Sequence, residues 1–166
     1  YRISKDQNGA VGTANNYGSG IISFVLKKLV KNSVDFPPLY CVQVCGELIN
    51  SGHNVEYSKS LDIKNNFDLY IVPSSIVCHE TEILHIKKLI EKNKEVIVIG
   101  PFATSNPENY VKAGAKVVKG EPEMFFHNIK MSVEEIKKLP QVISNFQVFD
   151  INKLSMPGWE TIFRLY

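Results

Sequence analysis

Two of the three cysteines have a spacing that belongs to iron–sulfur chemistry. Cys41 and Cys45 match the first two positions of Cys-x-x-x-Cys-x-x-Cys, whose three thiolates hold a four-iron cluster. Leu48 stands at the third position, and Cys78 lies in another part of the chain. On a helix, Cys41 and Cys45 are one turn apart and face the same way. The sequence therefore predicts buried, small apolar side chains here and no cluster held by this chain.

The four histidines do not form a pattern that would hold a metal ion. Glu82-Ile-Leu-His85 has the Glu-x-x-His spacing of carboxylate metal sites, but such sites need a second copy on a facing helix, and the sequence has none. We therefore expect Glu82 and His85 to form a surface pair. His53 and His127 are expected to be structural or solvated, whereas His79 follows a predicted strand at the edge where ligands would bind.

Small residues and glycines recur in loops that follow apolar runs. Three such loops are Ser74-Ser75-Ile76, Gly100-Pro101-Phe102 and Gly120-Glu121. Glycine lets the backbone approach a bulky ligand closely, whereas Pro101 removes one N–H donor. An alternative interpretation is that the serines cap a helix and Gly-Pro only turns the chain.

A strand–helix–strand pattern places two of these loops. Asp68–Pro73 and Glu95–Gly100 are apolar runs without polar alternation, which is typical of strands covered on both faces. Between them, residues 81–93 place apolar side chains on one helical face and charged side chains opposite, which predicts a crossover helix. The apolar side chains are Ile83, Ile86, Leu89 and Ile90. The carboxyl ends of the two parallel strands, with their loops, would therefore lie at one edge of a sheet.

The remaining elements complete an α/β pattern. We expect helices over Leu39–Asn50, with Gly52 after its end, and from Asn106-Pro107-Glu108 to Gly114. Further predicted strands are Arg2–Ser4, a strand that begins at Val55-Glu-Tyr57, Lys116–Val118, and the short pair Val142–Ser144 and Phe146–Phe149; Ile21–Val30 is predicted to be an extra helix. The most economical architecture is a flavodoxin-like, doubly wound, mainly parallel five-stranded sheet.

Length and composition fit one domain. The chain has 166 residues, 44% of them hydrophobic, which is enough to bury a core. Residues 1–150 are expected to form the domain, with residues 1–35 an atypical start and residues 151–166 an exit linker. The net charge of +2 gives no electrostatic case for nucleic acid, and the apolar runs are too short for a membrane span. We expect a cytoplasmic protein that binds neither nucleic acid nor membrane.

Glycines near the amino end give weaker signals. Gly18-Ser-Gly20 followed by Ser23 imitates the start of a dinucleotide-binding loop, but it lies more than a dozen residues beyond the presumed first strand. Gly12 and Thr13 lie in a small-residue stretch, Gly9–Ala14, that could fold over a ligand at the sheet edge or simply connect two elements.

The order of these motifs resembles a known family. Gly100-Pro-Phe-Ala-Thr104, Gly120-Glu-Pro-Glu123 and Met156-Pro-Gly-Trp159 follow one another along the chain, and Pro37-Pro38-Leu39 and Ser51-Gly-His-Asn-Val55 precede them. The series is similar to the cobalamin-binding domain that precedes the barrel in cobalamin-dependent radical S-adenosylmethionine enzymes. That domain typically carries Gly-Gly-Pro-His-Ala-Thr, Gly-Glu-Gly-Glu and a Pro-x-x-Trp-like exit. Ser74-Ser75-Ile76 resembles its Ser-x-Leu element.

The resemblance implies a corrin held over the carboxyl edge of the sheet with its nucleotide tail buried. The implied contacts are Gly12, Thr13, Ser74, Ser75, Ile76, Gly100, Pro101, Phe102, Gly120 and Glu121. The chain lacks Asp-x-His-x-x-Gly, the motif that supplies a histidine to cobalt, so bound cobalamin would be base-off without a histidine ligand. S-adenosylmethionine and the four-iron cluster would belong to a catalytic barrel after Tyr166, which would carry out methyl transfer or related radical chemistry.

Two other functions stay open. A flavodoxin-like domain that has lost its cofactor and docks a partner is favoured by Gly100-Pro101 in place of Gly-Gly and by the missing histidine motif. A nucleotide-binding regulatory domain is favoured only by Gly18-Ser-Gly20.

Overall fold

The computed structural model contains a parallel sheet of four described strands. It describes residues 21, 25, 38–58, 63–64, 66–76, 78–127, 129–145 and 150–160. The strands are β1 (Leu69–Pro73), β2 (Glu95–Ile99), β3 (Lys116–Gly120) and β4 (Val142–Asn145), and they lie in the order β1-β2-β3-β4. All three neighbouring pairs are parallel, so the carboxyl ends of the strands share one edge.

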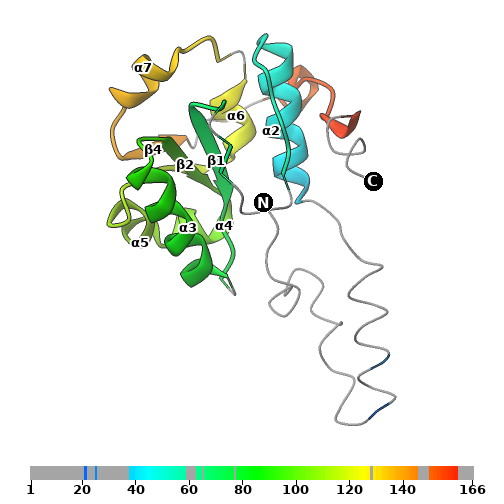
Figure 1. Ribbon diagram of the computed structural model, residues 1–166. Coiled ribbons are helices and arrows are strands. Elements are labelled where there is room, and N and C mark those ends of the chain that lie inside the picture. Colours follow the sequence, from blue (N-terminus) through cyan, green and yellow to red (C-terminus); the bar gives the residue numbers. More distant parts are fainter. Residues whose placement is uncertain are drawn as a thin grey trace.

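Helices pack on both faces of this sheet (Figure 1). One face carries α3 (His79–Glu91), α4 (Pro101–Ser105) and α5 (Pro107–Val111), and the other carries α2 (Leu39–Asn50), α6 (Pro122–Phe126) and α7 (Val133–Lys137). Side chains of β2 alternate between the two cores, since Val96 and Val98 join the first cluster and Ile97 and Ile99 the second. The prediction of an α/β architecture with a parallel sheet is confirmed, and the arrangement is compatible with a flavodoxin-like fold.

Local sequence signals set several boundaries. The predicted helix Leu39–Asn50 is confirmed, and Gly52 follows it with φ of +87°, a conformation that glycine adopts without strain. Proline stands at the start of α4, α5 and α6, where its missing N–H costs no helical hydrogen bond. Ser132 begins α7 with a capping box, because its hydroxyl accepts from the Glu135 N–H and Glu135 accepts from the Ser132 N–H.

The buried face of α3 differs from the prediction. The helix begins at His79, and its buried residues are Glu82, His85, Ile86 and Leu89, whereas Ile83 and Ile90 are only partly buried. Glu82 and His85 were expected to form a surface pair, and that expectation is wrong. They share the inward stripe because positions i, i+3, i+4 and i+7 lie on one side of a helix.

One predicted strand is wrong and several predictions lie outside the described residues. Residues 55–57 form no strand, because no described strand lies beside them to complete a ladder. The structure does not describe residues 2–4 and 146–149, or Gly12 and Thr13, and of 21–30 only Ile21 and Val25 are described, both helical. Within the described ranges, no helix is long and apolar enough to cross a membrane.

Candidate functional site

The three predicted loops lie next to one another at the carboxyl edge of the sheet. Ser74-Ser75-Ile76 follows β1, Gly100-Pro101-Phe102 follows β2, and Gly120-Glu121 closes β3. The strands β1, β2 and β3 are consecutive neighbours, so the loops line one continuous edge. This edge, defined by those eight residues, is the place where parallel α/β sheets bind ligands.

The side chain of Ser74 is buried and forms a hydrogen bond within the protein. Its side chain is 5% exposed, and its Oγ accepts a hydrogen bond of 2.9 Å from the main-chain N–H of Ala103. Ala103 lies in the first turn of α4, where N–H groups lack partners within the helix. Ser74 therefore ties the loop after β1 to the loop after β2.

Gly100 is covered by a side chain from α2. Its φ is +105°, and a Cβ built on it would lie 2.8 Å from Tyr40 Oη and 3.1 Å from Ser74 Oγ. Only glycine fits there, for reasons of both backbone conformation and space. Burial raises the pKa of Tyr40, with Cys41 and Glu82 adding to the shift. The close approach that the sequence suggested for a ligand is made here by Tyr40.

The outer part of the carboxyl edge stays open. Ile76 is 71% exposed, Pro101 and Glu121 are exposed, and Ser75, Phe102 and Gly120 are partly buried. Gly120 has φ of +92°, and its N–H donates to Thr104 Oγ1 at 3.2 Å. These residues form an apolar rim with polar groups at its ends.

His79 stands at this rim. Its ring lies against Phe102 with centroids 5.3 Å apart, and Nδ1 lies 3.0 Å from the carbonyl oxygen of Ile76. Because a carbonyl can only accept, the tautomer that makes this bond carries its proton on Nδ1. The ring is thereby held in place at the edge of the loop after β1.

Glu82 lies beneath the same edge. The sequence had predicted that this residue lies on the surface. It is 0% exposed, and its Oε2 accepts a 2.6 Å hydrogen bond from the hydroxyl of Tyr110. Its Oε1 has no hydrogen-bond partner among the described residues. Burial raises the pKa of Glu82 to about 7, although Tyr110 and the main chain of Ser75 act in the opposite direction. The helical stripe shared with Ile86 and Leu89 was the signal that could have revealed its burial.

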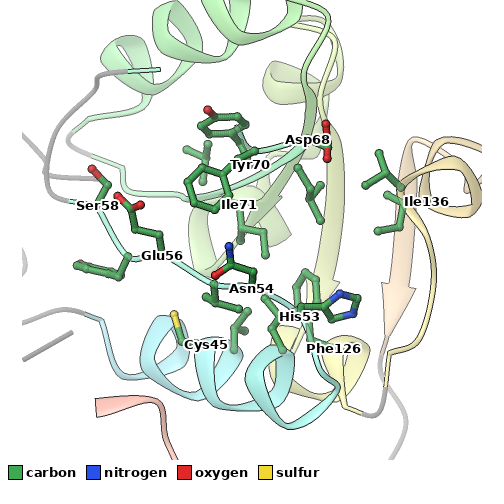
Figure 2. A pocket seen from close by; sticks show the side chains of 18 of the residues that line it. Cys45, His53, Asn54, Glu56, Ser58, Asp68, Tyr70, Ile71, Phe126 and Ile136 are labelled. Atoms are coloured by element: carbon green, nitrogen blue, oxygen red, sulfur yellow. The ribbon is translucent and has the colours of Figure 1, made fainter. Parts of the chain in front are cut away.

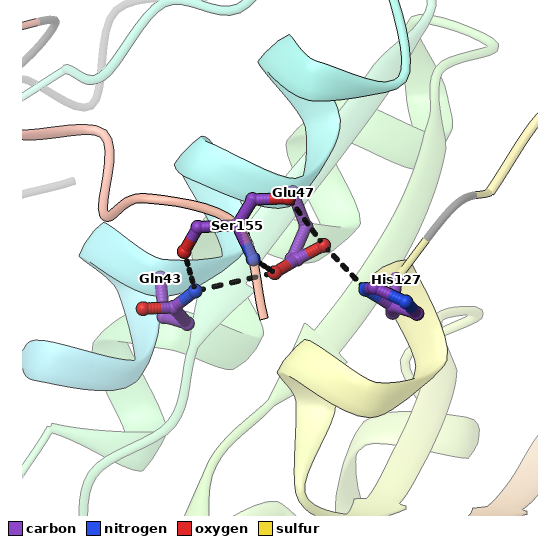
Figure 3. Close-up of polar contacts among 4 residues, drawn as sticks. All are labelled: Gln43, Glu47, His127 and Ser155. Atoms are coloured by element: carbon purple, nitrogen blue, oxygen red, sulfur yellow. Dashed lines mark hydrogen bonds and ion pairs between the residues drawn. The ribbon is translucent and has the colours of Figure 1, made fainter. Parts of the chain in front are cut away.

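A second buried carboxylate lies on α2, away from the carboxyl-edge loops. Glu47 accepts hydrogen bonds from Gln43 Nε2 at 3.2 Å, from the N–H and Oγ of Ser155 at 2.6 and 3.0 Å, and from His127 Nδ1 at 2.9 Å (Figure 3). Burial alone would raise its pKa, but these bonds outweigh burial, and the pKa is lowered. Glu47 therefore holds the exit segment, residues 150–160, against α2 and α6.

Two glycines let the exit segment approach α2 closely. A Cβ on Gly46 would lie 2.2 Å from the carbonyl oxygen of Met156, and a Cβ on Gly158 would lie 2.9 Å from Cys45 Cβ. The N–H of Gly158 donates to the Val42 carbonyl at 2.9 Å. The expected irregular exit through Pro157-Gly158 is thus packed along α2.

A cavity of about 500 Å³ lies beside β1, on the side away from β2. Its walls are β1, the segment 53–58 and α2, and Figure 2 shows Asn54, Glu56 and Ser58 on one side with Tyr70 and Ile71 across from them. We call this cavity the slot. None of the eight residues of the carboxyl edge lines it, but Pro73 and Ile99, which directly precede two of those loops, do. Cys41, Cys45 and the residues His53–Val55, singled out in the sequence for other reasons, line it as well.

The cysteines are buried thiols. Cys41, Cys45 and Cys78 are free, and burial raises the pKa of each, that of Cys45 to about 11. Such thiols carry little thiolate at neutral pH. In the described part of the chain, no group of three or more histidine, cysteine or acidic side chains could hold a metal ion.

Comparisons with protein families, with characterised proteins and with solved structures found no match for this chain.

Proposed function

We propose that this chain is a cobalamin-binding domain, of the kind that precedes the barrel in cobalamin-dependent radical S-adenosylmethionine enzymes. The observation that carries the proposal is the contiguity of the three predicted loops at the carboxyl edge of β1, β2 and β3. The ordered motifs from Pro37 to Trp159 supply the choice of ligand, because the edge alone fits several cofactors.

The residues present fit such a ligand in part. Ser74 and Gly100, two of the expected ligand contacts, are buried and already contacted by Ala103 and Tyr40. The open rim of Ser75, Ile76, Pro101, Phe102, Gly120 and Glu121 remains for contact with a corrin ring and its amide side chains. An apolar platform with polar ends suits a large, flat ligand of that kind. Cobalamin, when bound, would supply a cobalt centre for transfer of a methyl group.

The proposal includes a base-off cofactor without a protein ligand to cobalt. Asp-x-His-x-x-Gly is missing from the sequence. His79 is the one histidine at the described rim, and its ring is held on Phe102 and bonded to Ile76. We assign it to packing of the loop.

Three parts of the proposal extend beyond the described sheet. We propose that the complete fold is flavodoxin-like, with five strands and doubly wound topology. We also propose that S-adenosylmethionine and the four-iron cluster belong to a barrel that follows residues 151–166, and that the protein works in the cytoplasm. The buried thiols Cys41, Cys45 and Cys78 support placing the cluster elsewhere.

A second candidate is a cofactor-free domain that docks a protein partner. The contact of Tyr40 Oη with the Gly100 loop favours it, because this side chain lies where a ligand tail would enter. Exposed apolar side chains at the rim, such as Ile76, suit a protein partner as well as a corrin.

The visible spectrum separates these candidates. Protein mixed with hydroxocobalamin and passed through gel filtration should retain corrin absorbance, and the cobalt(II) state should show no nitrogen ligand from histidine in paramagnetic resonance. Ile76→Asp, at the rim, should weaken retention at least about tenfold, because it places a charge beneath an apolar ring. Leu84→Asp is the matched control, since Leu84 is 61% exposed on α3 and lies outside the rim. Colourless protein would favour the docking domain, and equal retention by the two variants would show that the site is misplaced.

A further inference from the structure

One chain of contacts joins the buried carboxyl of Glu82 to the rim through α5. The Tyr110 hydroxyl donates to Glu82 Oε2 at 2.6 Å, and both side chains are 0% exposed. The Tyr110 ring meets the Phe102 ring edge-on, with centroids 6.3 Å apart. Phe102 belongs to the rim, so a change at Glu82 is felt there after a single intervening side chain.

A second chain of contacts runs through the loop after β1. The main-chain N–H of Ser75 donates to the carboxyl of Glu82. The Ser75 carbonyl accepts from the Cys78 N–H at 3.2 Å, and the Cys78 carbonyl accepts from the Glu82 N–H at 2.9 Å. Ser75 is therefore tied to the first turn of α3 by its N–H and by its carbonyl.

The two chains of contacts meet at His79. Its ring lies on Phe102 with centroids 5.3 Å apart, and its Nδ1 lies 3.0 Å from the Ile76 carbonyl oxygen. The contacts thus form a closed set, which we call the rim network. Its members are Ser75, Ile76, His79, Glu82, Phe102 and Tyr110.

A proton on Glu82 changes both chains of contacts at their common origin. A carboxylate only accepts, and hydrogen bonds to a charged acceptor are roughly twice as strong as those between neutral groups. Oε1 has no partner among the described residues, so it is the oxygen available to carry a proton. Protonation therefore weakens the bonds from Tyr110 and Ser75 and adds a buried O–H that needs an acceptor.

The ionisable groups around this carboxyl are uncharged at neutral pH. They are Tyr40 of α2, Cys78 before α3 and His85 one turn further along α3. Burial raises the pKa values of Tyr40 and Cys78 and lowers that of His85. No cation among these neighbours faces Glu82, so the donors from Tyr110 and Ser75 oppose the effect of burial, and the pKa of Glu82 is raised to about 7.

We propose that Glu82 is a pH-sensitive support of the rim, whose charged form fixes the loop after β1 and Phe102 and whose protonated form loosens both. The rim is then firm above neutral pH and looser below it. A ligand or partner that needs the firm form binds better on the alkaline side of neutrality. This proposal holds equally for a rim that carries a corrin and for one that docks a protein.

Nuclear magnetic resonance of the full chain from pH 5 to 9 tests the proposal at the Ser75 amide. Its proton should move downfield as pH rises, with a midpoint of about 7, because its acceptor becomes charged. The Glu82 carboxyl carbon should titrate with the same midpoint. Protection of Ser75 from hydrogen exchange, corrected for the intrinsic rate, should rise at least ~5-fold. The Gly120 amide, which donates to Thr104 Oγ1 in a neighbouring loop, is the internal control and should not follow this titration.

Three variants separate Glu82 from other sources of pH dependence. Glu82→Gln cannot ionise, so the Ser75 amide should lose its titration. Tyr110→Phe removes a donor to the charged form and should move the Ser75 and Glu82 midpoints upward together. His79→Asn keeps a side-chain donor beside the Ile76 carbonyl but does not titrate, and the Ser75 titration should persist in it.

Four results would overturn the proposal. The first is a Ser75 amide that does not titrate in the parent chain, and the second is a midpoint that differs from that of the Glu82 carboxyl. The third is loss of the titration in His79→Asn, which would assign the response to His79. The fourth is a Ser75 midpoint that stays in place in Tyr110→Phe while that of Glu82 moves, a result that decides the matter even where Glu82→Gln does not fold.

Discussion

Glu47 and Glu82 are both closed off from solvent, yet different groups surround them. Both side chains are 0% exposed. Glu47 on α2 accepts four hydrogen bonds, whereas Glu82 on α3 has the Tyr110 hydroxyl on one oxygen and no partner for the other within the described residues. The pKa of Glu47 is lowered and that of Glu82 is raised to about 7. Burial favours the protonated form of both carboxyls, and the donors around Glu47 outweigh it, whereas those around Glu82 do not.

The two buried carboxyls therefore have different roles in the fold. A carboxylate with a full set of donors fixes the segments that supply them, and here it joins α2, α6 and the exit segment. A carboxyl with few donors exchanges its proton near neutral pH, and Glu82 does so directly beneath the carboxyl edge. Perturbed groups of the second kind cluster at functional sites.

The largest loss of stability is expected from Glu47→Ala. The change leaves the N–H and hydroxyl of Ser155, the Gln43 amide and the His127 Nδ1 without their acceptor, which should cost about 4 kcal/mol of unfolding free energy. Urea unfolding followed by circular dichroism measures it. Glu134→Ala is the control, because Glu134 is an exposed carboxylate that forms an ion pair with the exposed Lys137. A loss at Glu47 no greater than that of the control would show that the four bonds do not stabilise the fold.

The second prediction concerns pH. The folded pKa of Glu82 lies above its ordinary value, so folding favours the protonated form, and this contribution to stability is complete below pH ~4.5 and lost as pH rises through about 7. The loss is on the order of 3 kcal/mol. Glu82→Gln should remove this dependence when unfolding is measured from pH 5 to 8. An unchanged slope in Glu82→Gln would assign the dependence to another group.

The contribution of Glu47 to stability should change in the opposite direction with pH, and the same pH series measures it. Its folded pKa is lowered, so its stabilisation is present above pH ~4.5 and is lost as pH falls below that value. Stability of the parent chain should therefore decline on both sides of a maximum near pH 5.

The smallest effect is expected from Tyr110→Phe. It removes the one side-chain hydroxyl that donates to Glu82 and should cost about 1.5 kcal/mol. It should also move the titration of Glu82 upward from about 7, because that bond lowers the pKa. Carbon-13 NMR of the glutamate carboxyl carbons reports both the midpoint and its direction. A downward shift would mean that Tyr110 stabilises the protonated form.

Much of the fold could be predicted from the sequence because it rests on local signals. Apolar runs without alternation identified β1 and β2, and the cap at Gly52 and the proline at 107 set helix boundaries close to those observed. These signals depend on residues next to one another in the chain. The placement of the three loops at one edge followed from parallel strand order alone.

What could not be predicted depends on contacts between distant residues. Nothing near Gly100 in the sequence indicates that Tyr40 covers it, and the partners of Glu47 are 80 and 108 residues away. The strand expected at Val55 requires a neighbour that is not among the described strands. The burial of Glu82 reverses the usual preference of a charged side chain, because Tyr110 and a raised pKa make burial tolerable.

The contact between Gly46 and the exit segment has a mechanical consequence. Tension applied to the chain at Trp159 passes first into the Val42–Gly158 main-chain bond and the Ser155–Glu47 bonds, because these fasten the exit segment along α2. The parallel ladders that join β1 to β2, β2 to β3 and β3 to β4 carry that load only after those bonds have broken. The exit segment therefore protects the sheet from a force applied at the carboxyl end of the described chain. A side chain at Gly46 would push Met156 away from α2 and so remove this protection.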